Sequence, residues 1–170
     1  MTRIGLLSDT HGYLSPKIFT HFKEVDEIWH AGDIGTTDLV DELENFKPLR
    51  AVYGNIDGAD MRVRYPENLF FVLDGVKVLM MHIGGYPPNY NVNSKPLIAQ
   101  YQPDLFICGH SHILKAMPDS KNNLLHLNPG ACGVHGWHQI ATIMRFALHE
   151  GRVKNLEVIE LGKRGKLMDV

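Results

Sequence analysis

The apolar residues of this chain fall into short runs, and most of these runs end in polar residues and glycine. The first three runs have the length and flanking residues of buried strands and occupy positions 3–8, 26–33 and 49–55. Between them, 16–25 and 36–46 carry apolar residues at helical spacing, with Ser15 and a threonine available as N-caps. The order β-α-β-α-β is typical of a mostly parallel sheet covered by helices.

From residue 68 onward the pattern favours hairpins. Two apolar runs within 68–82 flank Asp74-Gly75, a dipeptide favoured in two-residue hairpin turns. The remaining runs predict a helix at 94–102, a buried strand at 104–110, and strands at 124–130, 139–151 and 152–161. We therefore expect one domain spanning residues 1–170, with helices outside two packed sheets.

Composition changes this picture little. The chain has 170 residues, 44% of them hydrophobic, and a formal net charge of −2, which gives no electrostatic reason to expect a nucleic-acid or membrane surface. Cys108 and Cys132 are too few for a disulfide framework. The start of the chain lacks the apolar region of a signal peptide, so we expect a cytoplasmic protein. The basic segment 162–170 is expected to be a frayed tail.

Polar residues collect where the predicted strands end. Ligands in sheets of this kind bind beyond the carboxyl ends of the strands, so these side chains are expected to converge. Seven of them are candidates for chemistry: Asp9, His11, Asp33, Asn55, His82, His110 and His112. Taken singly, Asp9 could cap a turn and His82 could be a hydrogen-bonded structural histidine. Six strand endings with the same character favour a shared site.

The residue types indicate the chemistry of that site. Carboxylates, imidazoles and a carboxamide form the mixed nitrogen and oxygen set that suits Mn, Fe or Zn at catalytic centres. Cysteine is missing from these positions, which argues against a closed structural zinc. Seven ligands exceed the needs of one ion but fit two ions that share a carboxylate. Such pairs catalyse displacement at phosphorus, so we expect hydrolysis of a phosphate ester.

The ordered motifs D-x-H, G-D, G-N-x-D, an isolated His and G-H-x-H resemble those of the calcineurin-like metallophosphoesterases. The short chain is similar to their compact YfcE-like phosphodiesterase subgroup, and the resemblance runs from about residue 3 to residue 160. It implies an α/β fold of the mixed α+β kind, a four-layer α-β-β-α sandwich with two mixed sheets.

The resemblance also implies roles for the seven candidates. One metal would be held by Asp9, His11 and His112, a second by Asn55, His82 and His110, and both would be bridged by Asp33. A hydroxide between the ions would be the nucleophile, and the catalytic residues would be Asp33, Asn55, His82 and His110. The ions are expected to be manganese, with iron, zinc or nickel as alternatives.

Two positions depart from the family pattern. Many members carry a histidine after the asparagine that protonates the leaving oxygen or steadies the phosphate, and this chain has Ile56. General acid catalysis is typically worth about 10²–10⁴-fold, so its loss favours diesters with good leaving groups. The family often has glycine directly after the isolated histidine, whereas Ile83 and Gly84 follow His82 here.

Several further residues are secondary candidates. His30 is expected to pack rather than bind metal. A surface loop is the preferred interpretation for His135, Trp137 and His138, with a substrate groove or a substitute acid as the alternative. Asp57 either orients a neighbour or closes a turn. A rigid aromatic loop that shapes the pocket rim or an oligomer contact is formed by Tyr86, Pro87, Pro88 and Tyr90.

The leading hypothesis is a phosphodiesterase for a small phosphodiester or nucleotide-like substrate, with no membrane and no extended nucleic acid as partner. A phosphomonoesterase or nuclease is the alternative within enzymes. The rival from another class is a protein-interaction scaffold, as in the retromer subunit of this fold, whose metal positions are altered. Homo-oligomer formation, the physiological substrate and the native metal are left open by the sequence.

Overall fold

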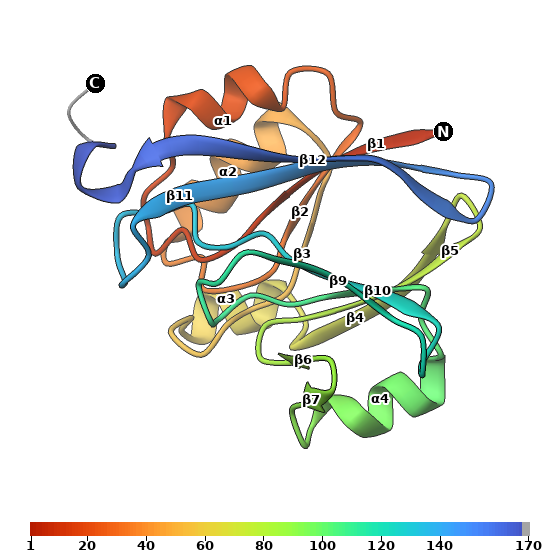
Figure 1. Cartoon of the computed structure of the whole chain (residues 1–170). Coiled ribbons are helices and arrows are strands. Elements are labelled where there is room, and N and C mark those ends of the chain that lie inside the picture. Colours follow the sequence, from red (N-terminus) through yellow and green to blue (C-terminus); the bar gives the residue numbers. More distant parts are fainter. Residues whose placement is uncertain (168–170) are drawn as a thin grey trace.

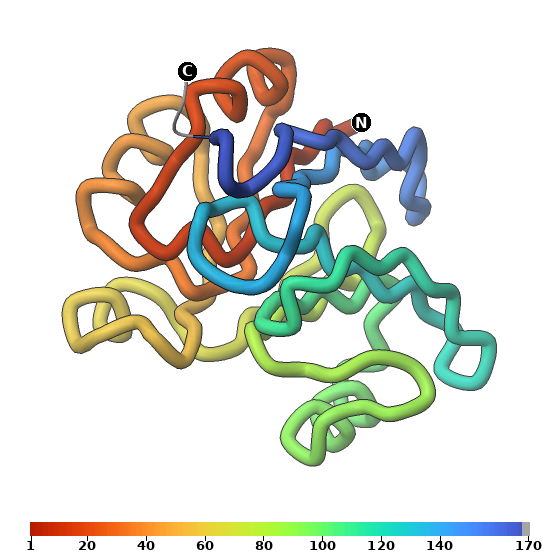
Figure 2. The backbone as a smooth tube through the Cα atoms, turned by 60° about the vertical axis from the view of Figure 1, so that its left-hand side comes forward, coloured from red at the N-terminus to blue at the C-terminus, as the bar shows by residue number. Residues whose placement is uncertain are grey.

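Two β-sheets pack face to face in the computed structural model, which describes residues 1–167, and helices cover both outer faces (Figure 1). The first sheet has the strand order β12-β11-β1-β2-β3. Its parallel centre is β1 (Thr2–Leu7), β2 (Glu27–His30) and β3 (Leu49–Ala51), and its antiparallel edge is β11 (Ile140–His149) and β12 (Arg152–Lys163). Figure 2 shows this return of the chain, with the C-terminal strands beside the N-terminal half.

The second sheet is built entirely from the middle of the chain, in the order β4-β5-β8-β10-β9. Its strands are β4 (Asn68–Leu73), β5 (Val76–Met81), β8 (Leu105–Ile107), β9 (Lys115–Asp119) and β10 (Leu124–Asn128). The central strands β5, β8 and β10 are parallel, while β4 and β9 are antiparallel edges. The turn between β4 and β5 is Asp74-Gly75, as the sequence predicts.

Helices form the outer layers. On the first sheet lie α1 (Pro16–His21), α2 (Thr37–Phe46) and α3 (Ala59–Arg64), and on the second lies α4 (Ser94–Tyr101). The side chains of Ser15 and Thr36 accept hydrogen bonds from the first-turn N–H groups of α1 and α2, which confirms them as N-caps. The four-layer α-β-β-α prediction is therefore confirmed.

The hydrophobic core is divided into three clusters, one between each pair of neighbouring layers. One apolar cluster lies between the first sheet and its helices, a second between the two sheets, and a third between the second sheet and α4. Trp29 fills the layer between the sheets, where its ring meets Phe71 and Phe146 edge-on. This packing fixes the two sheets relative to each other and thereby positions the strand ends.

The sequence pattern does not indicate four elements: the helix α3, the strands β6 (Gly85–Tyr86) and β7 (Asn89–Tyr90) of a small hairpin, and the strand β9. Each is short, and β9 has no long apolar run. The expected frayed tail is wrong for residues 162–167, since a 3₁₀ helix (Arg164–Lys166) forms there and Leu167 is buried. Residues 168–170 lie outside the described part of the chain. No helix within residues 1–167 is long and apolar enough to cross a bilayer.

His126 gives the fold a testable dependence on pH. Its ring is buried on β10, where Nδ1–H donates to the carbonyl of Phe106 at 3.1 Å, and burial lowers the pKa of His126 to about 4 from 6.5. The folded state therefore favours the neutral ring. The contribution of His126 to the free energy of unfolding is fully present above pH 6.5 and is lost as the pH falls towards 4. We predict that His126→Leu removes part of this loss, on the order of 2 kcal/mol between pH 7 and pH 4.

Urea unfolding across that pH range measures the effect, with His21→Leu at the end of α1 as the control. Parallel pH profiles for wild type and His126→Leu would contradict the prediction.

Candidate metal centre

The first group of candidate ligands, Asp9, His11 and His112, comes together beyond the ends of β1 and β8. The Nε2 atom of His112 lies 3.3 Å from Oδ1 of Asp9, and Nε2 of His11 lies 3.9 Å from the same oxygen. The other carboxylate oxygen, Oδ2, accepts hydrogen bonds from the Ser8 hydroxyl at 2.7 Å and from the N–H of His110 at 3.1 Å. Asp9 is thus anchored through one oxygen and presents the other to two imidazoles.

The second group contains Asp33, His82 and His110, with Asn55 beside them. Nε2 of His82 lies 3.2 Å from Oδ2 of Asp33. On the far side of that ring, Nδ1–H donates to the carbonyl of Ala31 at 2.7 Å, so Nε2 is the ring nitrogen that faces the carboxylate. Nδ1 of His110 is 3.0 Å from the side-chain oxygen of Asn55.

Asp33 joins the two groups. Its Oδ2 atom is 3.2 Å from Nε2 of His82 in the second group and 3.4 Å from Nε2 of His11 in the first. Its Oδ1 atom accepts a hydrogen bond from the backbone N–H of Ile56 at 3.1 Å, which fixes the carboxylate plane. The seven side chains therefore form one continuous cluster in which Asp33 has the shared position.

Buried atoms without partners show that this cluster fits metal ions. Within residues 1–167, Oδ1 of Asp9, Nε2 of His11 and Nε2 of His82 are buried and have no hydrogen-bond partner. Leaving one such atom unsatisfied costs about 1–3 kcal/mol, so three of them facing one space call for a cationic partner. The donors are carboxylate oxygen and imidazole nitrogen, the set that divalent ions such as Mn, Fe and Zn accept.

The electrostatics keep both carboxylates ionised. Burial raises the pKa of Asp9, but the nearby imidazoles of His11, His112 and His82 outweigh burial and hold that pKa far below its usual range. The pKa of Asp33 is likewise lowered, because His82 outweighs the effect of burial. Burial lowers the pKa of the His110 ring. A dense negative centre surrounded by imidazoles is suited to bind cations.

The turns that carry these residues are strained. Left-handed backbone, with φ between 45° and 70°, occurs at five of the seven candidates: Asp9, His11, Asp33, His110 and His112. Such a conformation costs of order 1–3 kcal/mol at a residue other than glycine and concentrates at functional sites. The sharp turns aim two side chains from one strand end at the same point. Paired turns reinforce each other, since the N–H of His11 donates to the carbonyl of Asp33 at 3.0 Å.

Glycine precedes several candidates because the strand ends touch. A Cβ atom at Gly109 would overlap the Ser8 hydroxyl, and one at Gly54 would overlap the carboxylate of Asp33. These two contacts bring the end of β8 against β1 and the end of β3 against β2. The close approach of backbone to side chain is what glycine allows at both places.

The side chains of Asp57 and Asn128 hold the turns that carry the candidate ligands. For Asp57 the sequence left two roles open, orienting a neighbour or closing a turn. Its carboxylate accepts hydrogen bonds from the N–H groups of Gly54, Ile34 and Gly35. It therefore closes its own turn and also links that turn to the one that carries Asp33. Asn128 donates to the carbonyl of Gly109 at 3.0 Å.

His30 is buried, and its Nδ1 accepts the N–H of Gly32 at 3.1 Å while Nε2 lies 2.9 Å from the Thr10 hydroxyl. Burial lowers its pKa to about 4. It is placed as the packed residue that the sequence suggests, because both ring nitrogens are occupied.

The loop after β10 lies against the first group. The ring of His135 is exposed and 4.7 Å from that of His11, and Trp137 is exposed beside His112. His138 is not a surface residue as expected: it is buried, and its Nε2–H donates to the carbonyl of Gly133 at 2.8 Å. Arg164 donates to the carbonyls of His138 and Val134 at 2.8 and 3.1 Å. The sequence gives no signal of this role, because Arg164 belongs to the basic segment that is expected to be a tail.

The two positions that depart from the family pattern, Ile56 and Ile83, do not displace a candidate ligand. Ile83 follows His82, yet the ring of His82 still reaches Asp33. Ile56 contributes its backbone N–H to Asp33 and leaves its side chain 46% exposed. An aliphatic side chain therefore stands where an acid is expected.

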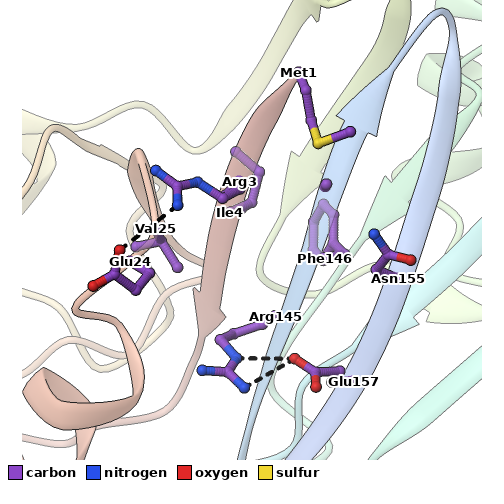
Figure 3. A pocket seen from close by; sticks show the side chains of 10 residues that line it. Met1, Arg3, Ile4, Glu24, Val25, Arg145, Phe146, Asn155 and Glu157 are labelled. Atoms are coloured by element: carbon purple, nitrogen blue, oxygen red, sulfur yellow. Dashed lines mark hydrogen bonds and ion pairs between the residues drawn. The ribbon is translucent and has the colours of Figure 1, made fainter.

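A cavity of about 320 Å³ adjoins the second group and includes Asn55 and His82 in its wall, together with Tyr53, Arg62 and Ile83. Its volume suits a small ligand. A separate cavity of about 240 Å³ lies at the start of β1, where Arg3, Ile4 and Phe146 line it and Arg145 pairs with Glu157 (Figure 3). The candidate ligands follow the opposite end of β1, so the first cavity is the one that belongs to the site.

Comparisons with known proteins agree with this geometry. A family model, the calcineurin-like phosphoesterase superfamily domain, matches residues 2–151. A "probable metallophosphoesterase" of Methanothermobacter thermautotrophicus is 30% identical over 135 residues, covering 75% of this chain and 76% of that protein. An archaeal phosphodiesterase of known structure aligns with a TM-score of 0.74 at 25% identity, covering 94% of this chain and 99% of its own.

The fold is also that of wild-type Vps29 complexed with Zn²⁺ from Entamoeba histolytica, with a TM-score of 0.65 at 17% identity over 94% of this chain and 99% of that one. This likeness concerns the fold alone.

Proposed function

Because this chain belongs to the calcineurin-like phosphoesterase superfamily, we propose that it is a divalent-metal-dependent phosphodiesterase that acts at a two-metal centre. The observation that supports the proposal most is the placement of Asp33, whose Oδ2 atom is within 3.4 Å of a histidine nitrogen from each group. A carboxylate in that position is what two neighbouring ions need as a shared ligand.

The seven side chains divide into two sets. Asp9, His11 and His112 would hold one ion, Asn55, His82 and His110 the other, and Asp33 both. When bound, the ions would supply positive charge that lowers the pKa of water and stabilises the attacking and leaving oxygens. The donor set favours manganese, with iron, zinc or nickel as alternatives.

The chain's own residues would orient the substrate. Asn55 has a carboxamide whose N–H₂ group can donate to a phosphate oxygen while its oxygen faces His110. The adjoining cavity gives one substituent of the phosphate a place to lie, beside Tyr53 and Arg62. Because Asp9 and Asp33 are buried, their attraction for divalent cations would be screened less by water.

Diesters with good leaving groups are the proposed substrates. The side chain at position 56 can neither donate nor accept a proton, so the leaving oxygen must depart without help from this position. A formal net charge of −2 gives little attraction for a long polyanion, which favours a small phosphodiester or a nucleotide-like molecule. We propose that the protein works in the cytoplasm.

Asp33→Asn tests the two-metal assignment. The substitution keeps the size of the side chain but removes the charge shared by the two groups. We predict that hydrolysis of bis(p-nitrophenyl) phosphate with added Mn²⁺ falls by more than about 100-fold, whereas Asp38→Asn, on the exposed first turn of α2, leaves the rate unchanged. An inactive wild type that is insensitive to this substitution would favour the scaffold; a preference for the monoester p-nitrophenyl phosphate would overturn only the diesterase assignment.

Ile56→His tests the missing acid. A histidine here would be able to protonate a leaving oxygen, so the rate for a diester with a poor alkyl leaving group should rise, by up to about 100-fold. The rate for a p-nitrophenyl ester should change only a few-fold, because that leaving group needs no proton. Ile56→Gln is the matched polar variant that carries no proton of suitable acidity. The same change in the ratio of the two rates for both variants would refute the role assigned to position 56.

A further inference from the structure

Exposed apolar side chains occur beside several of the polar residues of the candidate metal centre. An isoleucine follows directly after four of the seven candidate ligands; Ile34, after Asp33, is buried, whereas those after Asn55, His82 and His112 are exposed. The three exposed isoleucines, with the neighbouring Leu114 and Trp137, are between 38% and 74% exposed, and we call the five residues the apolar rim: Ile56, Ile83, Ile113, Leu114 and Trp137.

The position of the rim is what makes it informative. Single exposed apolar residues are common on protein surfaces, but a group of them around a concave site marks a place of contact. Ile83 lines the cavity beside the second group, and Trp137 lies beside His112 in the first, so a molecule that brings a phosphate to the centre meets apolar side chains near both groups. A polar residue at each position would have been more favourable for solubility alone.

Trp137 is held in place rather than free to move. Its indole N–H donates to the carbonyl of Ser111 at 3.1 Å, between the two histidines of G-H-S-H, and its ring centroid is 6.3 Å from that of His112. The loop that carries it is fixed at both sides by Arg164. An exposed aromatic ring whose orientation is already set loses little entropy when it binds a planar group.

We infer that the apolar rim selects phosphodiesters with an apolar, planar substituent, which packs against Trp137 and Ile113 while the phosphate lies at the metal centre. The inference rests on the proposed phosphodiesterase function and names its substrate class. An aryl group or a nucleobase meets the requirement, because either has the apolar face that stacks on indole. A short alkyl substituent would reach the centre but leave the rim uncovered.

Two esters that share a leaving group test this inference, phenyl p-nitrophenyl phosphate and methyl p-nitrophenyl phosphate. The ratio of their kcat/KM values is compared between wild type, Trp137→Ser and Ile113→Ser, so that the intrinsic reactivity of the esters cancels. We expect each variant to lower the phenyl-to-methyl ratio by about five- to tenfold, while the methyl ester is hydrolysed at nearly the wild-type rate. Val158→Ser, an exposed apolar residue on β12, is the matched control and should leave the ratio unchanged.

An unchanged ratio, or an equal loss for both esters, would overturn the inference. Rim variants that dissociate an oligomer without moving the ratio would do the same and would assign the rim to contact between copies, which light scattering detects. Hydrolysis of neither ester would instead count against the proposed function.

If neither ester is hydrolysed, a binding measurement still tests the rim. Trp29 is buried and Trp137 is exposed, so a ligand that packs on the rim changes the emission of Trp137. With Zn²⁺ added, diphenyl phosphate should give a saturable change in tryptophan emission that is lost in Trp137→Ser and weakened in Ile113→Ser. Dimethyl phosphate at the same concentrations should give none. A wild-type emission that does not respond to diphenyl phosphate would refute the proposed binding of planar apolar groups by the rim.

Discussion

A carboxylate without exposed surface, that of Asp9, lies where the ends of the two sheets meet. Its Oδ2 atom accepts hydrogen bonds from the hydroxyl of Ser8, directly after β1 of the first sheet, and from the N–H of His110, after β8 of the second, so one side chain connects both halves of the sandwich. The surrounding imidazoles keep it ionised although burial opposes this. A buried charge is tolerated only when it is paired, and the other ligand residues supply the pairing around it.

The remaining architecture can be understood as support for that charge. Parallel strands in each sheet bring six carboxyl ends to one edge, and left-handed turns direct the side chains inward. The strain of those turns is offset by hydrogen bonds that the Asp57 carboxylate accepts and that the Asn128 side chain donates. The apolar core between the sheets, with Trp29 at its middle, keeps the two edges in register.

The sequence could predict what depends on local pattern. Apolar runs with polar endings identified the strands around the site and the residues that converge there, because strand ends in one sheet share an edge. It could not predict α3 or β9, which are short and stabilised by neighbours. It also missed Arg164, because a basic residue near the chain end has the same local pattern whether it is solvated or bound to distant carbonyls. The buried ring of His138 is not evident from the sequence either, because the residue lies in a polar, glycine-rich loop. The metal-binding roles, the substrate and the cellular location remain predictions.

The central claim, that one chain holds two ions sharing Asp33, is tested most directly by metal binding itself. Purified protein is loaded with Mn²⁺, freed of excess ion, and examined by elemental analysis and electron paramagnetic resonance. Ions about 3.5–4 Å apart couple magnetically, so the account predicts two Mn²⁺ per chain and the spectrum of a coupled pair. One ion or none per chain, or two ions with the spectra of isolated Mn²⁺, would contradict it.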